Sequence, residues 1–164
     1  RCVPFAGWAA HRGAAVDGPT GTLRAHDADL AFADDAPAHR HFHCAVDWVL
    51  DARAGGLAFA RDGEAMLRVE WLPAERRVRL LRVGAGRDPD GRAWFTHDVL
   101  SEAPCATPRR WAVQVVDGEV QVEAEGRVVL HTWTEAAAGP VSLWVEQGAA
   151  QVRTKRLAPM RAPG

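Results

Sequence analysis

The sequence predicts an all-β protein, an antiparallel two-sheet β-sandwich of the jelly-roll type. Short apolar segments, several of which alternate apolar and polar residues, are separated by turn clusters of Gly, Asp and Pro at roughly 8 to 12 residue intervals. No segment shows a convincing amphipathic helical period. The clearest signal lies at 110–134, where two turn sequences separate three alternating segments. We therefore expect roughly ten to twelve strands in two packed layers.

The segment 110–134 predicts a three-stranded antiparallel meander, and its first turn is Asp117-Gly118. This dipeptide between alternating apolar residues favours a type I′ turn, because both residues tolerate the positive φ that the turn requires. A tight turn at this point pairs Val115 with Val120. The turn therefore sets the register of the first two strands of the meander.

The second connection of the meander, 124–126, fits a three-residue loop with Gly126 in the left-handed conformation. This loop would place Val122 opposite Val128. One face of the meander is then apolar and needs a second layer to cover it. The opposite face is polar, and it carries Gln114, Glu119, Gln121, Glu123, Arg127, His131 and Trp133.

The remaining strands are expected on both sides of the meander. We expect them at 21–25, 39–50, 57–60, 66–72, 77–83 and 94–100, and then as a closing pair at 140–146 and 149–157. Loops are expected at 34–37, where two Asp residues precede a Pro, and at 84–91, which is rich in Gly and Asp. Gly55-Gly56 is interpreted as a break between two strands.

Length and charge exclude several classes of protein. A chain of 164 residues can bury one core, so we expect a single domain over 1–164. The formal net charge of −1 and the pI of about 6.7 offer no basic surface for nucleic acid. No apolar run of about 18 residues could span a membrane. The chain begins with Arg1 and shows no signal-peptide pattern, so we interpret it as a mature or excised segment, with compartment and oligomeric state left open.

The three cysteines, Cys2, Cys44 and Cys105, have no CxxC spacing. We interpret them as buried structural thiols, because free cysteine is usually buried. A disulfide between two of them is the alternative, and the odd number would leave the third one free.

His39, His41 and His43 share one side of the alternating segment 39–50, with Asp47 farther along it. His-x-His on a strand can bring two imidazoles to one metal ion. A zinc site normally needs a third ligand from elsewhere, and none is identifiable. We therefore interpret the histidines as a solvated strand face and expect no bound zinc, with a metal at His41 and His43 as the alternative.

Asp88-Pro89-Asp90-Gly91 offers two carboxylates at a spacing found in calcium loops. The distant Glu and the additional oxygen ligands of an EF-hand are missing, so a plain turn is the preferred interpretation. We therefore expect no cofactor, with calcium at Asp88 and Asp90 as the alternative.

Trp133 is one of seven tryptophans, and the register of the meander places it on the polar face. An indole can pack on the apolar face of a sugar ring while neighbouring amides and carboxylates bind the hydroxyls. We therefore interpret Trp133, His131, Gln121 and Glu123 as a ligand-binding set. The alternatives are that a loop or a neighbouring domain covers this face, or that its glutamates act as acid and base in glycoside cleavage.

The chain resembles the concanavalin A-like lectin/glucanase superfamily in the order of its segments. The residues that carry the resemblance are Trp8, Gly21-Thr-Leu, His41-Phe-His-Cys-Ala-Val-Asp-Trp, Asp117-Gly118 and Gly139-Pro-Val-Ser-Leu-Trp-Val-Glu-Gln-Gly. Within the superfamily the chain is similar to the C-terminal sandwich of family 32 glycoside hydrolases and to laminin-G-type and 3-keto-disaccharide hydrolase-type modules. The Glu-x-Asp-x-x-Glu and Trp-x-Asn-Asp-Pro catalytic motifs are absent, so no catalytic residue is carried over. The resemblance implies a jelly roll and carbohydrate recognition.

We therefore expect a non-catalytic module that binds carbohydrate or supports a neighbouring catalytic domain. A second hypothesis is a glycoside hydrolase of the 3-keto-disaccharide hydrolase type, in which His131, or His41 with His43, works with a metal or a carboxylate. A third is a structural sandwich that docks to a partner domain or forms oligomers.

Overall fold

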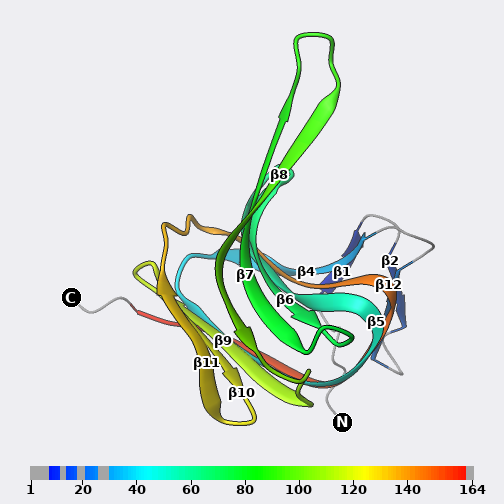
Figure 1. The fold of residues 1–164 in the computed structure, drawn as a ribbon, viewed down its shortest axis with the longest axis vertical. Helices are drawn as coiled ribbons and strands as arrows, with labels where there is room; N and C mark the ends of the chain where they lie inside the picture. The colour runs from blue at the N-terminus through cyan, green and yellow to red at the C-terminus, as the bar shows by residue number, and fades with distance from the viewer. Residues whose placement is uncertain (1–7, 12–13, 18–20, 26–29, 162–164) are drawn as a thin grey trace.

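The computed structural model describes residues 8–11, 14–17, 21–25 and 30–161, and all regular structure in this part is β-strand. Every strand pair is antiparallel. The described residues accordingly include no helical segment with the length and apolar character of a membrane span. The strands are β1 (Trp8–His11), β2 (Ala14–Asp17), β3 (Thr22–Ala25), β4 (Leu30–His39), β5 (Phe42–Asp62), β6 (Ala65–Leu72), β7 (Arg77–Arg87), β8 (Ala93–Pro104), β9 (Arg110–Val116), β10 (Glu119–Ala124), β11 (Arg127–Trp133) and β12 (Gly139–Pro159) (Figure 1).

The strands form two layers that share β5 and β12, each 21 residues long. We call the layer β1-β4-β12-β5-β6-β7-β8 sheet A, and the layer β2-β3-β12-β5-β9-β10-β11 sheet B. In sheet A, residues 142–146 of β12 pair with 54–58 of β5, and in sheet B residues 148–159 pair with 42–52. Each long strand therefore passes from one sheet to the other. This is the all-β sandwich that the sequence predicts.

A change of alternation marks the point where the long strands change sheets. In the core cluster between the two sheets, the buried residues of β5 are even-numbered up to Trp48 and odd-numbered from Leu57 onward. Gly56 is required there, because a Cβ on it would lie 1.9 Å from the Val69 carbonyl oxygen. On β12, Gly148 faces β5 with a φ of 146°. The predicted strand break at Gly55-Gly56 and the predicted closing pair after residue 139 are therefore wrong, since each is one bent strand.

The apolar core lies between the two sheets and contains a cluster of indoles. Trp111 lies with its ring centroid 5.0 Å from Trp48 and 6.1 Å from Trp71. All three side chains are buried, and they come from β9, β5 and β6. Large aromatic side chains of this kind contribute strongly to core stability, and here they join the two layers.

The first hairpin of the meander confirms the predicted turn and register. Asp117 and Gly118 have φ values of 54° and 79°, as a type I′ turn requires. Val115 pairs with Val120 across the two strands. Both valines are buried, so the apolar side of this hairpin faces the core.

The second hairpin differs from the predicted register. A two-residue turn, Glu125 (φ 51°) and Gly126 (φ 81°), joins the strands, and a bulge follows it. Val122 consequently pairs with Leu130, while Val128 is turned outward and is 52% exposed. The reason is the side chain of Glu125, whose Oε1 accepts hydrogen bonds from the backbone N–H groups of the β9 start, 109–110.

Two predicted loops are also strands. Residues 34–37 lie inside β4, which pairs with β12, and residues 84–87 continue β7. The β7–β8 hairpin projects from the sandwich (Figure 1). Within the hairpin, the Trp94 ring lies over Gly86 of the opposite strand, since it would be 2.2 Å from a Cβ at that position.

Two of the three cysteines fall within the described residues. Cys44 is buried, and Cys105 is a half-buried free thiol. Burial raises the pKa of the Cys105 thiol. Cys2 lies outside the described residues.

Candidate functional site

The outer face of sheet B carries a row of four polar side chains that crosses four neighbouring strands. His131 of β11 lies opposite Gln121 of β10, which lies opposite Gln114 of β9 and then His43 of β5. Their chain neighbours point into the core, so alternation turns all four outward. We call these four residues the polar row. Because strands lie about 4.8 Å apart, the row is about 14 Å long.

Trp133 lies beside the polar row and is the most exposed large apolar side chain described, at 66%. Its ring centroid is 4.5 Å from that of His131. Both rings are held at the end of β11, where the strand lies at the edge of sheet B. The indole is therefore positioned by its neighbours and open to solvent.

Glu119 holds the Trp133 end of the polar row in place. Its Oε1 accepts a hydrogen bond from Gln121 Nε2 at 2.9 Å and lies 2.8 Å from His131 Nε2. The bond to His131 and then the bond to Gln121 lower the pKa of Glu119. Glu119 is therefore a carboxylate at neutral pH, and it fixes the orientation of two side chains that border Trp133.

Two hollows open on this side of the molecule. The first, of about 720 Å³, borders Trp133 and is lined by Arg40, Asp117 and residues 134–138. The second, of about 540 Å³, has Ala45 and Ala112 among its lining residues, and we call it the alanine hollow. Its polar lining residues include His43, Asp47, Arg110, Glu123, Thr154 and Arg156.

The structure brings the predicted ligand-binding residues to one face. Trp133, His131 and Gln121 adjoin one another, and Glu123 lies one step along β10 and borders the alanine hollow. Sequence reasoning missed that His43 and its strand complete this surface. The alternation of 42–48 indicated that His43 points outward, but pairing of β5 with β9 is a long-range contact that alternation does not encode.

The three histidines predicted to share a strand face do not share one. His39 ends β4, His41 lies in the bend after it, and only His43 lies in β5. The strand begins at Phe42 because His41 Nδ1 accepts a hydrogen bond from the backbone N–H of Asp117, 3.0 Å away. Among the described residues, no group of three or more His, Cys, Asp or Glu side chains could hold a metal ion.

Asp88 and Asp90 lie in the turn at the tip of the β7–β8 hairpin. The Asp88 carbonyl oxygen accepts a hydrogen bond from the Gly91 N–H at 2.8 Å. Arg92 donates its backbone N–H to Asp90 Oδ1 at 3.5 Å, and its side chain lies 3.9 Å from the same carboxylate. This geometry is that of a turn, which was the preferred interpretation of the sequence.

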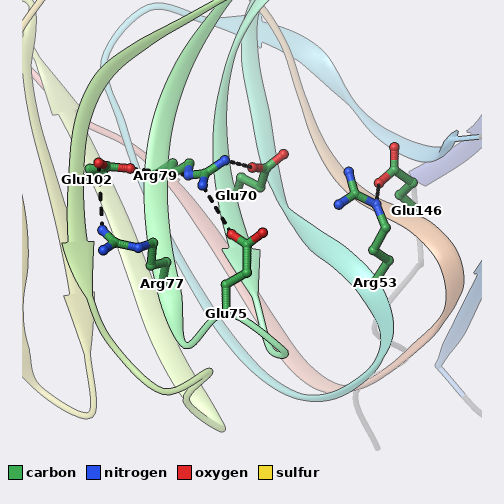
Figure 2. Close-up of polar contacts among 7 residues, drawn as sticks. All are labelled: Arg53, Glu70, Glu75, Arg77, Arg79, Glu102 and Glu146. Carbon is green, nitrogen blue, oxygen red and sulfur yellow. Dashed lines mark hydrogen bonds and ion pairs between the residues drawn. The ribbon is translucent and has the colours of Figure 1, made fainter.

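The outer face of sheet A carries charged side chains that neutralise one another, and sequence analysis did not identify it. Figure 2 shows Arg79 directed at the carboxylates of its neighbours. Its guanidinium lies 3.1 Å from Glu75, 3.3 Å from Glu102 and 3.9 Å from Glu70. Arg77 adds a contact of 3.7 Å to Glu102. Arg77 and Arg79 therefore each face at least one carboxylate.

Beside these ion pairs, packed side chains exclude solvent from the outer face of sheet A. The Trp144 indole donates its Nε1–H to the Val69 carbonyl oxygen at 3.1 Å, and the Arg68 guanidinium lies 4.6 Å above the indole ring. Trp144 has no exposed surface, and Arg68 and Glu70 are buried. Burial raises the pKa of Glu70, and the guanidinium of Arg68 opposes the shift most strongly. We call this surface the closed face.

No family model and no curated protein matches the sequence. Among solved structures, the chain is similar to the carbohydrate-binding module CBM66 from Bacillus subtilis, with a TM-score of 0.71 and 14% identity over 92% of this chain and 94% of that one. It is also similar to a Bacillus subtilis protein of unknown function with a galectin-like fold (TM-score 0.70, 11% identity, 97% and 92% covered). A native glycosidic hydrolase matches with a TM-score of 0.59 and 8% identity, over 96% and 92%. The chain therefore has the concanavalin A-like jelly-roll fold that its sequence resembles.

Proposed function

We propose that the chain is a non-catalytic module that binds a neutral carbohydrate on the outer face of sheet B, with Trp133 as the stacking platform. The observation that carries this proposal is the indole of Trp133, 66% exposed and held beside the polar row. A large exposed aromatic surrounded by fixed polar groups is typical of a binding site. The fold that the chain shares with a carbohydrate-binding module supports the same function by analogy.

The polar groups around Trp133 suit the hydroxyls of a sugar ring. Gln121 offers an amide donor and acceptor, His131 an imidazole, and Glu123 a carboxylate acceptor. Water competes for each of these contacts, and one aromatic ring supplies most of the apolar contact. We therefore expect weak binding, with a Kd of about 0.1 to 1 mM.

Hydrolysis is the alternative, and the 2.8 Å contact between His131 and Glu119 is the observation that favours it. Glycoside cleavage normally needs one carboxyl group that stays protonated near neutral pH and donates to the leaving group. The pKa of Glu119 is shifted in the opposite direction. Binding without turnover is therefore the better match to this face.

The experiment compares two exposed tryptophans on a panel of neutral glycans. Trp133→Ala should abolish the sugar-induced shifts of amide resonances, whereas Trp94→Ala, which removes an indole 43% exposed on the projecting hairpin, should leave them unchanged. Both variants should melt within a few degrees of the parent protein, because surface substitutions change stability by about 0.5 kcal/mol or less.

Three results would overturn the proposal. The panel could give no response, the two tryptophan variants could behave alike, or the sugars could be cleaved during the measurement. The last result would favour a hydrolase. The first, together with a stable association of this face with another domain, would favour a structural module.

A further inference from the structure

We propose that the alanine hollow is a second subsite for the same glycan, so that one oligosaccharide lies across the strands of sheet B from Trp133 to Arg110. This inference rests on the proposed function, and it adds the class of ligand. The protein would recognise several consecutive units of a linear neutral chain, rather than a single sugar.

Continuity of the surface is the first argument. The alanine hollow and a small depression beside it share His43, Ala112 and Glu123 as lining residues. The other two residues of the depression are Gln114 and Gln121 of the polar row. Polar side chains therefore follow one another without interruption from the Trp133 end of the row to the hollow.

The separation of the two ends is the second argument. Trp133 pairs with Glu119 of β10, and Ala112 pairs with Glu123 of the same strand. Glu123 follows Glu119 by four residues, so the two positions are about 13 Å apart along the strand direction. Across the sheet, the hollow lies over β9 and β5, about 12 Å from β11. The two positions are therefore about 18 Å apart. A monosaccharide cannot reach both of them, whereas a chain of several sugars can.

The chemistry of the alanine hollow indicates a neutral ligand. Arg110 Nε lies 3.3 Å from Asp47 Oδ2, so this pair cancels its own charge while it still offers donors and acceptors. Glu123 and Arg156 add one further group of each sign. Lys155 also lines the hollow, but it pairs with the core-facing Val46 and therefore starts from the opposite side of β12. The volume of about 540 Å³ is within the roughly 300 to 1000 Å³ of typical ligand sites. Side chains of both signs around a floor of small residues suit a ring rich in hydroxyls.

The test uses malto-, cello- and xylo-oligosaccharides from one to six sugars, titrated into the folded protein and followed by calorimetry and amide resonances. In the parent protein the affinity should rise with chain length by about tenfold or more, because the longer chain engages the second subsite. Amide resonances at Ala45 and Arg156 should shift with the hexasaccharide and stay unchanged with the monosaccharide.

Ala45→Leu is the informative variant, because it fills the floor of the hollow. It should keep the affinity for the shortest ligand and lose the increase with chain length. Ala106→Leu, which enlarges an exposed alanine in the segment between β8 and β9, is the matched control and should bind as the parent does. Trp133→Ala should weaken binding at every length.

The outcomes separate the two proposals. If no oligosaccharide binds the parent protein, the proposed function fails. If short and long chains bind it equally, or if Ala45→Leu keeps the full length dependence, carbohydrate binding stands and the second subsite is wrong. The resonance shifts at Ala45 and Arg156 decide the matter in the parent protein even if the leucine variant does not fold.

Discussion

The two outer faces of the sandwich both carry polar side chains on strands, yet they differ in what these side chains contact. On the closed face of sheet A, Arg79 is surrounded by three carboxylates and Arg68 covers an indole. On sheet B, Trp133 is exposed and hollows open beside the polar row. The number of charged side chains therefore does not distinguish the candidate binding face. Side chains accessible to solvent and the hollows beside them distinguish it.

Small residues show the physical origin of this difference. On sheet A, Gly56 lies beneath the indole of Trp144, which reaches across it to the Val69 carbonyl and fills the space. On sheet B, Ala45 and Ala112 pair with each other, and the space above them stays open. The same gap in a sheet surface thus becomes either a packing site or a candidate subsite, depending on whether a neighbouring aromatic side chain occupies it.

The largest effect should come from adding a methyl group to the closed face. Gly56→Ala places a Cβ 1.9 Å from the backbone oxygen of Val69, and a backbone atom cannot rotate away. We expect a loss of about 4 kcal/mol or more in the free energy of unfolding, measured by urea denaturation. Ala45→Leu on sheet B should cost less than about 1 kcal/mol. Comparable losses for the two variants would show that the faces are packed alike.

The next test removes one arginine from each face. Arg68 is buried on Trp144, so Arg68→Ala uncovers the indole and removes the cation that most strongly favours the charged form of the buried Glu70. Glu70 then keeps the 3.9 Å contact to Arg79. We expect it to cost about 3 kcal/mol. Arg110→Ala breaks an exposed pair with Asp47 and should cost less than about 1 kcal/mol. Thermal melts of both variants measure the difference, and a larger loss for Arg110→Ala would contradict the distinction between closed and open faces.

The smallest expected effect concerns the pH dependence of stability, to which Glu70 and Glu119 should contribute with opposite signs. The folded pKa of Glu70 is above its ordinary value of 4.5, so its contribution to stability is fully present below that pH and is lost as pH rises through the folded pKa. The folded pKa of Glu119 is below 4.5, so its contribution is present above that pH and is lost as pH falls through the folded pKa.

Glu70→Gln and Glu119→Gln test these signs. From neutral pH down to about 3, the parent protein should gain stability relative to Glu70→Gln and lose stability relative to Glu119→Gln. Urea denaturation at several pH values measures both differences. Slopes of the same sign would mean that the two carboxylates experience similar environments.

Local sequence patterns were sufficient for the fold class and for part of the site. Alternation of apolar and polar residues placed His131 and Trp133 outward, and Asp117-Gly118 set the first hairpin, because turn chemistry and strand period are local properties. The second hairpin was mispredicted, since the Glu125 side chain binds backbone groups of β9 and selects a shorter turn. The prediction that three histidines share one strand face was wrong for a similar reason, because His41 accepts a hydrogen bond from the backbone of the distant turn at Asp117.

The sequence by itself determined that this chain is an all-β protein with a polar sheet face and a tryptophan on it. Only the tertiary structure decided that β5 lies beside β9, which adds His43 and the alanine hollow to that face. It also decided that Arg68 and Glu70, polar residues at outward positions of β6, are buried. The physical reason is that strand period records which way a side chain points, whereas its neighbours and the water around it depend on pairing between distant segments.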